Sequence, residues 1–242
     1  MGPSAGEDTL TCRLAELTRP ELARRAEAGA IGIVPVGALE QHGAHLPVGT
    51  DALLIESICL AAAGRAQADV LVTPPVWTGF SPHHLRFGAT VSLRSETFLD
   101  LLRDVVRTMT PWLPRVVLVN GHGGNRGPLT ILALEESCVA VTYWDLVKES
   151  TLRELFPADS GSIGHAGQAE TSLMLSVAPD LVGEPARGFS PIATESDAFL
   201  VPDMGVTGIL GDPSAGDARL GGRFFDAASE ALAAYLDQLP NS

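Results

Sequence analysis

The sequence predicts an α/β fold with a largely parallel sheet. Short β-branched runs alternate with longer segments of helical character along the chain. The two clearest strand-like runs, IGIVPV and RVVLVN, are apolar and are each followed at once by a glycine-containing polar segment. The 242 residues contain no internal repeat and no linker-like stretch, so we expect one domain over residues 1–242, with the first ten residues flexible.

The first half of the chain alternates the two kinds of element. Pro20 stands where a helix tolerates proline, in the first turn. Thr50 is expected to cap a helix, and Ser95 opens SETF, which resembles a capping box. In chain order we expect a helix at Pro20–Ala30, a strand at Ile31–Val36, a helix from Thr50 to about Ala63, strands at Val70–Val76 and Ala89–Leu93, and a helix from Ser95 to about Thr110.

The second half repeats the alternation and ends in a loop-rich stretch. Residues 185–222 are rich in Gly, Pro, Asp and Ser, which is typical of extended loops, and an amphipathic helix follows them. The expected elements are a strand at Arg115–Asn120, a helix at Gly127–Ser137, a strand at Cys138–Trp144, a helix at Gln168–Val177 and a last helix at Gly222–Leu239.

Composition excludes several classes of function. The formal net charge of -13 argues against binding to a nucleic-acid backbone. No apolar run is long enough to span a bilayer, and MGPSAGEDTL lacks the basic and apolar regions of a signal peptide. The three cysteines are widely spaced and form no CxxC pair, so we expect neither a zinc knuckle nor a disulfide framework, and a cytoplasmic location.

Polar clusters follow two of the predicted strands. GALEQHGAHLPVGTD (Gly37–Asp51) comes after the first, and GHGGN comes after RVVLVN. In sheets of this type, sites gather at the carboxyl ends of the strands. All six histidines of the chain also fall in loops or at element ends, which favours a chemical role over packing in the core.

Three side chains of the first cluster suit a metal site. Glu40 and His42 are two residues apart, so in an extended segment both point the same way. Asp51 comes at the start of the following helix, and its two oxygens could bridge two ions. Asp51 could equally serve only as a helix cap. His45 is close by, but we leave it out of the ligand set.

Two later clusters supply the missing partners. His122 follows a buried strand, and the glycines beside it allow a sharp turn. The segment lacks the GxxxxGK[ST] spacing of a phosphate loop. In GHAGQAETSLML, Glu170 falls in the first turn of a helix, where it could simply complement the helix dipole, but this does not explain His165.

Together the three carboxylates and two imidazoles form a set of N and O donors. The set suits Zn²⁺, Mn²⁺ or Fe²⁺ rather than copper(I) or an iron–sulfur cluster. Two such ions joined by Asp51 and a hydroxide would provide a nucleophile at neutral pH and polarise a carbonyl. His165 could carry the proton to a leaving nitrogen. The predicted ligands are Glu40, His42, Asp51, His122 and Glu170.

The motifs PVGALEQHG, NGHGGN, YWDLVKE and HAGQAETSLML resemble those of the creatininase family, in the same order and over nearly the whole chain. The resemblance implies a metal-dependent hydrolase of C–N bonds with a layered α/β/α domain, two divalent ions per subunit and a homo-oligomer, often a hexamer. It implies that one ion is held by Glu40, Asp51 and His122, and the other by His42, Asp51 and Glu170.

The resemblance also bears on the substrate pocket. His165 matches the family's proposed catalytic histidine, and Trp144 matches an aromatic residue that closes over the substrate in creatininase, although a tryptophan after a strand could also be core. His83 or His84 is expected to line the pocket or a subunit interface, unless SPHHLRFGAT is only an exposed loop. Gly123 and Gly124 stand where creatinine-hydrolysing members carry Tyr and Glu. Both are expected to bind substrate, and an open pocket around them would favour a larger substrate.

Three functions fit the sequence, and the first of them is the main prediction. The first is hydrolysis of a small amide, cyclic amides included. The second is the same chemistry on a larger substrate, as in family members that act on formamides or trim a precursor peptide; the glycine form of NGHGGN is similar to these. The third is a non-catalytic member that binds metal or ligand, against which stands the complete set of matched ligand positions.

Overall fold

The computed structural model describes residues 11–113, 115–136, 138–157, 162–185, 189–190 and 204–239. The first ten residues, expected to be flexible, and much of the loop region expected between residues 185 and 222 lie outside this range. Among the described residues, no helix is long and apolar enough to span a bilayer.

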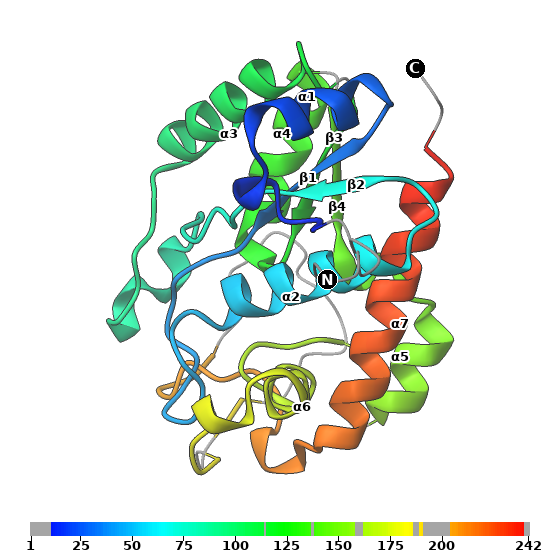
Figure 1. The fold of residues 1–242 in the computed structure, drawn as a ribbon. Helices are drawn as coiled ribbons and strands as arrows, with labels where there is room; N and C mark the ends of the chain where they lie inside the picture. Colours follow the sequence, from blue (N-terminus) through cyan, green and yellow to red (C-terminus); the bar gives the residue numbers. More distant parts are fainter. Residues whose placement is uncertain are drawn as a thin grey trace, which may run out of the picture.

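Four parallel strands form one sheet in the order β2-β1-β3-β4 (Figure 1). β1 is Ile31–Val36, β2 Val70–Val72, β3 Arg115–Asn120 and β4 Val139–Thr142. The longest pairing, between β1 and β3, aligns Ile31 with Arg115 and Val36 with Asn120. The carboxyl ends of the two central strands therefore lie side by side, and the predicted α/β fold with a parallel sheet is confirmed.

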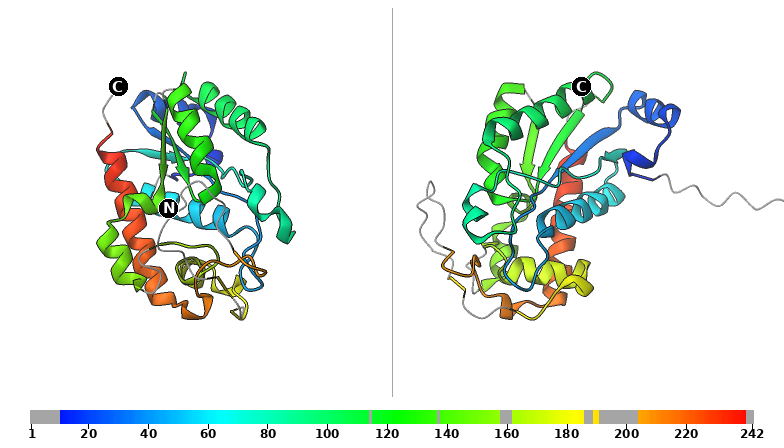
Figure 2. Two further views of the ribbon diagram at one scale, coloured as in Figure 1. Left: turned by 180° about the vertical axis from the view of Figure 1, so that it is seen from behind. Right: turned by 90° about the vertical axis from the view of Figure 1, so that its left-hand side faces the viewer.

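Helices cover both faces of this sheet (Figure 2). Side chains alternate along each strand, so Val117 and Val119 of β3 pack in the cluster that includes α2 and α7, whereas Val116 and Leu118 pack with α3 and α4. The result is the expected α/β/α arrangement. The helices are α1 Arg19–Glu27, α2 Thr50–Arg65, α3 Ser95–Met109, α4 Arg126–Glu136, α5 Glu149–Leu155, α6 Gln168–Val177 and α7 Ala218–Asp237.

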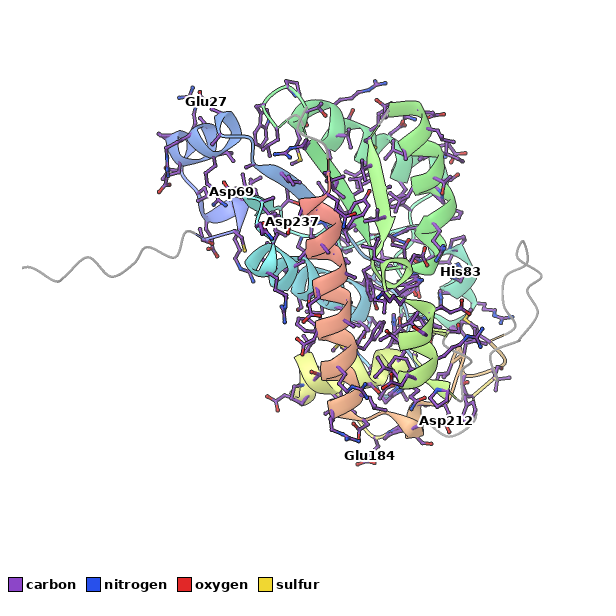
Figure 3. The ribbon with its side chains drawn as sticks, turned by 90° about the vertical axis from the view of Figure 1, so that its right-hand side faces the viewer. Glu27, Asp69, His83, Glu184, Asp212 and Asp237 are labelled. Atoms are coloured by element: carbon purple, nitrogen blue, oxygen red, sulfur yellow. The ribbon has the colours of Figure 1, made fainter. Side chains whose placement is uncertain are left out.

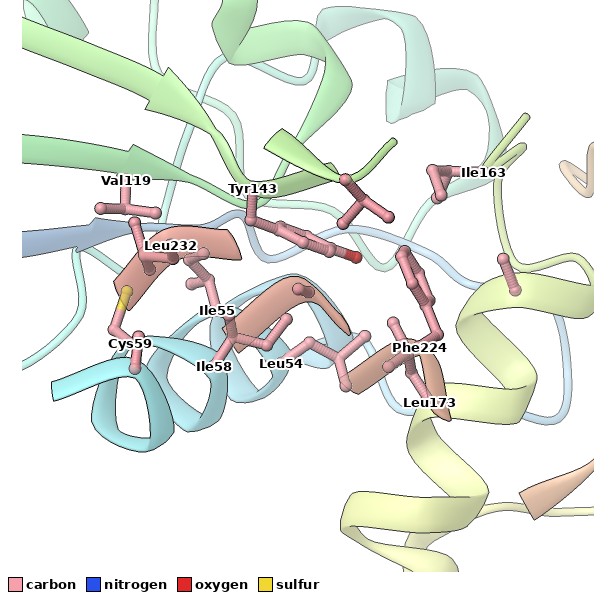
Figure 4. Close-up of a cluster of buried hydrophobic side chains, with 14 of the residues drawn as sticks. Leu54, Ile55, Ile58, Cys59, Val119, Tyr143, Ile163, Leu173, Phe224 and Leu232 are labelled. Carbon is pink, nitrogen blue, oxygen red and sulfur yellow. The ribbon is translucent and has the colours of Figure 1, made fainter. Parts of the chain in front are cut away.

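The core below the carboxyl ends of the strands joins α2, α7 and the segment after β4 (Figure 4). Tyr143 is only 2% exposed, and its ring lies 6.0 Å from that of Phe224. Leu54 and Ile55 of α2 belong to the same cluster. Full burial of an aliphatic side chain of this size stabilises a fold by about 1.5–3 kcal/mol, so this cluster fixes α2 firmly beneath the strand ends.

Several expected elements differ at their edges. Thr50 and Ser95 are the first helical residues rather than caps; the preceding Gly49 and Arg94 hold the N-cap positions. β2 stops at Val72 because two prolines follow shortly and cannot donate to a ladder. The predicted strand Ala89–Leu93 makes only isolated bridges.

The segment after β4 also differs from expectation. The strand ends at Thr142, and Tyr143–Leu146 turn into a 3₁₀ helix. α5 was not expected, since it is only seven residues long and gives a weak periodic signal. The last helix begins at Ala218, four residues before the predicted start, where the Asp217 side chain accepts a hydrogen bond from the N–H of Leu220.

Candidate metal centre

The loops that follow β1 and β3 both pack against the first turns of α2. A Cβ on Gly37 would lie 2.6 Å from the Cα of Ala52, and one on Gly121 would lie 2.7 Å from the Cβ of Ile55. Only glycine allows such an approach without displacing the helix. Two strand ends and one helix start therefore converge at a single place, which brings the predicted ligands of these three segments together.

His42 is fully buried, and its own loop sets the orientation of its ring. Nδ1 lies 3.0 Å from the carbonyl oxygen of Glu40, which can only accept a hydrogen bond. The neutral ring therefore carries its proton on Nδ1 and presents the lone pair of Nε2. That Nε2 lies 3.2 Å from Oδ1 of Asp51 and 3.8 Å from Oε2 of Glu170.

Asp51 lies in the first turn of α2 and faces both sides of the centre. Its Oδ1 is the oxygen close to His42, and its Oδ2 lies 3.0 Å from Nδ1 of His122. The N-cap position belongs to Gly49, so capping does not account for this buried carboxylate. Its two oxygens are divided between two imidazoles, as a bridging ligand requires.

His122 is held from behind by the segment Phe80–Ser81. Its Nε2 lies 3.1 Å from Oγ of Ser81 and 3.3 Å from the carbonyl oxygen of Phe80. Its Nδ1 then points to the centre, 3.2 Å from Oε1 of Glu40. A carbonyl behind a ring nitrogen fixes the tautomer and the direction of the other nitrogen, as is usual for metal-bound histidines.

The two asparagines of NGHGGN hold the loop that carries His122. The Asn120 side chain accepts a hydrogen bond from the N–H of His122 at 3.1 Å and donates to its carbonyl oxygen at 2.8 Å. The Asn125 side chain donates to the carbonyl oxygen of Gly37 at 3.0 Å and accepts from the N–H of Phe80 at 2.9 Å. Asn125 thus ties the loop after β3 to the loop after β1.

Two candidate ligand sets share Asp51. Glu40, Asp51 and His122 form one, and His42, Asp51 and Glu170 form the other; within each set the candidate ligand atoms lie within 4.8 Å of one another. Glu40 with His83 and His84, and Glu40 with His42 and His165, meet the same distance limit.

The residues present fit a pair of divalent ions. Both carboxylate oxygens of Glu40, Nε2 of His42 and Oδ2 of Asp51 are buried and make no well-formed hydrogen bond among the described residues, although carboxylate oxygens and imidazole nitrogens lie close to one another there. Leaving a buried carboxylate in this state is costly unless a cation pairs with it. The donors are imidazole nitrogens and carboxylate oxygens, the set preferred by Zn²⁺ and also accepted by Mn²⁺.

Charge in the centre is balanced between carboxylates and imidazoles. Burial acts to lower the pKa of His122, but the neighbouring Glu40 and Asp51 outweigh it and raise the pKa to about 10. Burial likewise opposes protonation of His42, yet Asp51 and Glu170 raise its pKa well above the usual value. Without metal, both imidazoles are therefore protonated at neutral pH.

Metal binding should consequently release protons. His42 and His122 must each lose one before they can ligate, so we expect about two protons per chain to appear on loading with Zn²⁺ at pH 7. The sign follows from the raised pKa values: metal affinity should increase as pH rises from 7 toward the pKa of about 10 for His122. Calorimetry in buffers of different ionisation enthalpy measures the count, and a count near zero would show that these imidazoles are not ligands.

His165 joins the centre from the segment before α6. Its backbone pairs with Leu210, which anchors it between two loops. Its Nε2 lies 2.8 Å from the carbonyl oxygen of Gln41, and its Nδ1 lies 3.5 Å from Oε1 of Glu40. Burial and the nearby His42 lower its pKa well below the usual value. His165 is therefore neutral at pH 7, with one nitrogen directed at the proposed ligands.

His84 comes from the 3₁₀ turn Pro82–Phe87 and also faces Glu40. Its Nε2 lies 3.3 Å from Oε1 of Glu40, and burial lowers its pKa to about 4. His83, labelled in Figure 3, belongs to the same turn and stacks on His122 with ring centroids 5.6 Å apart. The segment SPHHLRFGAT is thus part of the centre here, and not merely an exposed loop.

Comparison with known proteins decides the family. The family model for creatininase, described as creatinine amidohydrolase, matches residues 15–236. The chain belongs to the creatininase family. It is 35% identical over 207 residues to a mycofactocin precursor peptide peptidase of Mycolicibacterium smegmatis, with 80% of this chain and 78% of the relative covered. It is also 35% identical over 189 residues to a creatinine amidohydrolase of Pseudomonas putida, with 69% and 72% covered.

Solved structures agree with this assignment. A creatininase with Mn superposes with a TM-score of 0.81 at 29% identity, covering 94% of this chain and 98% of the other. A Zn–Zn form of a mutant creatininase gives 0.80 at 27% identity with the same coverage. This creatininase-family hydrolase therefore has buried clusters that fit a binuclear site, in a fold whose relatives have been solved with Mn and with Zn.

A large cavity opens over the centre of this creatininase-family chain. Its volume is about 810 Å³. Four of the predicted ligands line it, namely Glu40, Asp51, His122 and Glu170, and so do the residues predicted to bind substrate, which are Trp144, Gly123, Gly124 and His84. Trp144 is half-buried, with its ring edge-on to Tyr143 at 4.9 Å. The structure thus brings all the predicted site residues except His42 to the lining of one cavity, and His42 contacts two of them, Asp51 and Glu170. Their roles in binding and catalysis stay predictions.

The two glycines of the motif differ in what surrounds them. A Cβ on Gly123 would meet nothing within 4 Å, so the cavity is open at this residue. A Cβ on Gly124 would lie 2.3 Å from the carbonyl oxygen of Phe80 and 2.8 Å from Cε1 of His83. There is no room for a side chain at Gly124, because the Phe80 carbonyl, His122 and His83 fill its place.

Sequence reasoning missed several residues around the centre. Ser81 orients His122. The pKa of Tyr143 is raised well above the usual value, mainly by burial and also by the nearby Glu170 and Asp51. Gln41 contacts both His84 and His165. The position of Gln41 inside the EQHG motif was the sequence signal that could have identified it. His45, left out of the ligand set, bonds through Nε2 to Oγ1 of Thr171 at 3.0 Å and so ties the first loop to α6.

Proposed function

We propose that this chain is a divalent-metal-dependent hydrolase that cleaves a C–N amide bond in a peptide or a similarly large precursor. The observation that carries the proposal is the cavity of about 810 Å³ over the candidate metal centre. Pockets for drug-sized ligands typically have volumes of roughly 300–1,000 Å³, and this cavity is near the upper end of that range. Creatinine is a single five-membered ring and is much smaller than such ligands. Of the substrate classes considered above, the relatives and the cavity support the larger substrate better than the small amide.

The cavity continues beyond the centre along the edge of the sheet. A neighbouring groove of about 390 Å³ shares Arg126 and Asp145 with it and runs between α4 and β4. β4 is the last strand of the described sheet, and each of its residues is half-buried. An edge strand offers unpaired N–H and C=O groups to an extended peptide. The groove therefore offers an extended chain a place next to the site of cleavage.

In this proposal Glu40, Asp51 and His122 hold one ion, and His42, Asp51 and Glu170 hold the other. The ions, when bound, lower the pKa of water and polarise the scissile carbonyl. The protein positions these ligands through its own contacts: the Glu40 carbonyl aims His42, and Phe80 with Ser81 aims His122. Burial keeps bulk water away from the ligands, because all five are less than 9% exposed.

His165 is the proposed proton carrier. Its Nε2–H donates to the Gln41 carbonyl, so the proton to be transferred is accepted and released at Nδ1. The low pKa of the ring keeps Nδ1 free to accept a proton at neutral pH and makes the imidazolium a strong acid toward the leaving nitrogen. Trp144 and the open face at Gly123 would contact the substrate on either side of the scissile bond.

A hydrolysis screen with the Zn²⁺- and Mn²⁺-loaded protein tests this proposal. We expect kcat/KM for short and precursor-length peptides to exceed that for creatinine by about 100-fold, the discrimination that several lost pocket contacts produce. Turnover of creatinine with no peptide hydrolysis would return the function to the small-amide class, which the 35% identity to the Pseudomonas putida enzyme keeps as the second candidate.

A size variant sharpens the same screen. Gly123→Leu places a side chain in open space within the cavity, so it should lower kcat/KM for peptides about tenfold, and more than for any small amide. Gly127→Leu is the matched control, because its Cβ also meets nothing within 4 Å and the residue does not line the cavity. Equal losses in the two variants would show that residue 123 does not face the substrate.

A further inference from the structure

Gln41 lies between two proposed ligands in the sequence but is not itself one of them. Its side chain is 6% exposed. Its amide nitrogen lies 2.8 Å from the carbonyl oxygen of Gly208, 2.9 Å from Nδ1 of His84 and 3.2 Å from Nε2 of His165. Its amide oxygen lies 3.0 Å from the N–H of Gly43. Three separate segments of the chain therefore meet at this one amide.

Backbone groups fix which way the amide points. The Gly208 carbonyl can only accept a hydrogen bond, and the Gly43 N–H can only donate one. The flipped amide would place oxygen against oxygen at Gly208 and N–H against N–H at Gly43. The NH₂ group therefore faces Gly208, His84 and His165, and one of its two protons goes to the Gly208 carbonyl. Nε2 of His165 donates to the Gln41 carbonyl at 2.8 Å and has no lone pair for the amide, so the second proton goes to Nδ1 of His84.

The state of His84 follows from that orientation. Its Nδ1 has to accept the second amide proton, so it carries no proton of its own. The neutral ring then holds its proton on Nε2, the nitrogen that lies 3.3 Å from Oε1 of Glu40. His84 presents an N–H to the Glu40 carboxylate and has no lone pair on that side.

The backbone of the same residue gives His165 the opposite character. The Gln41 carbonyl lies 2.8 Å from Nε2 of His165 and can only accept, so that nitrogen carries the proton. The lone pair of His165 is then on Nδ1, which lies 3.5 Å from the same Oε1 of Glu40. One imidazole offers Glu40 a proton donor, and the other faces it with an acceptor.

We propose that Gln41 is a positioning residue that makes His84 face Glu40 with an N–H and His165 face it with a lone pair. The N–H of His84 then prevents Glu40, His83 and His84 from binding a third cation. These three residues have candidate ligand atoms within 4.8 Å of one another. A histidine ligates through a lone pair, and Gln41 keeps a proton on Nε2 of His84, the nitrogen that faces Glu40. The centre is thus limited to two ions although it contains ligands for more. This inference rests on the two-metal site of the proposed function.

Gln41→Glu tests the assignment with a change of nearly equal shape. A carboxylate only accepts, so His84 must then be protonated on Nδ1, and the lone pair of Nε2 turns toward Glu40. We expect bound Zn²⁺, measured by elemental analysis after gel filtration, to rise from two ions per chain to three. Adding His84→Phe to this variant should return the count to two.

Gln168→Glu is the matched control. Gln168 is also buried, at 8% exposure, and its amide donates to the carbonyl oxygen of Ala215 at 3.0 Å, with no imidazole among its described contacts. Its count should stay at two. Two ions in Gln41→Glu, or three in Gln168→Glu as well, would overturn the proposal.

The tautomers can also be read without metal and without any change at Gln41. Long-range ¹⁵N–¹H spectra of the metal-free, histidine-labelled protein should show His84 and His165 both protonated on Nε2, with the signals assigned from His84→Gln and His165→Gln. A proton on Nδ1 of His84 would overturn the proposal even if Gln41→Glu fails to fold. If the wild type held no divalent ion while these tautomers were found, the proposed function would fail and the positioning role of Gln41 would stand.

Discussion

Replacing Asp51 by Asn is expected to reduce turnover by at least about 1,000-fold and to lower the metal content of the protein. Asp51 gives one oxygen to the side of His42 and the other to the side of His122, at 3.2 and 3.0 Å. Asparagine keeps the shape but loses the negative charge and one of the two acceptor oxygens. It can therefore no longer join two cations.

The fold should survive this change, because α2 takes its N-cap at Gly49 and is held by its buried apolar face. Elemental analysis, turnover and circular dichroism measure the three quantities together. Asp217→Asn is the matched control: it is also an acid at a helix start, but its side chain does cap α7, so turnover and metal content should stay near those of the wild type. Retention of both metals and activity in Asp51→Asn would exclude the binuclear model. A wild type that binds metal but hydrolyses none of the substrates would favour the non-catalytic alternative.

Removal of the His165 imidazole is expected to separate catalysis from metal binding. We expect His165→Ala to lower kcat by about 100- to 10,000-fold, the range found for loss of a general acid or base. Both ions should remain, since the two ligand sets that share Asp51 do not include this ring. The Nδ1 that faces Glu40 at 3.5 Å would be replaced by empty space or water, so a leaving nitrogen would have no positioned proton source.

The measurement is kcat together with metal content on the same sample. His45→Gln provides the control, since it removes another buried imidazole from the same region while leaving an amide able to bond Thr171. Its kcat should stay within a few-fold of the wild type. If His165→Ala instead loses one metal ion, the ring is a ligand in the group with Glu40 and His42, and the proton-carrier role is wrong.

The sequence predicted the fold where one physical signal was strong and local. β1 and β3 have the predicted bounds because they are continuous β-branched runs between turn residues, and α6 matches its predicted range as well. Capping was predicted less well. Thr50 and Ser95 have side chains typical of caps, but the chain places them one residue later, inside the helix, where the preceding loop fixes the start.

The candidate ligands could be predicted from the sequence because the sheet topology determines which loops lie next to each other. Parallel neighbours bring their carboxyl ends to one edge, so a Glu and a His after one strand must approach a His after the next. The family motifs supplied Glu170 and His165, which come from a distant segment that no local pattern connects to the first cluster. The structure brings these residues into one buried centre.

By itself, the sequence determined the parallel sheet, the family and the residues that gather at the end of the strands, because hydrophobic pattern and motif order are properties of the chain. Only the tertiary structure decided how much space surrounds each site residue and which ring nitrogens carry protons. It filled the place beside Gly124 with the turn of His83 and His84, and it left Gly123 open. It also directed the Gln41 amide through the Gly208 carbonyl, 167 positions along the chain. Hydrogen-bond direction depends on which groups meet in space, and groups so far apart meet only when the chain has folded.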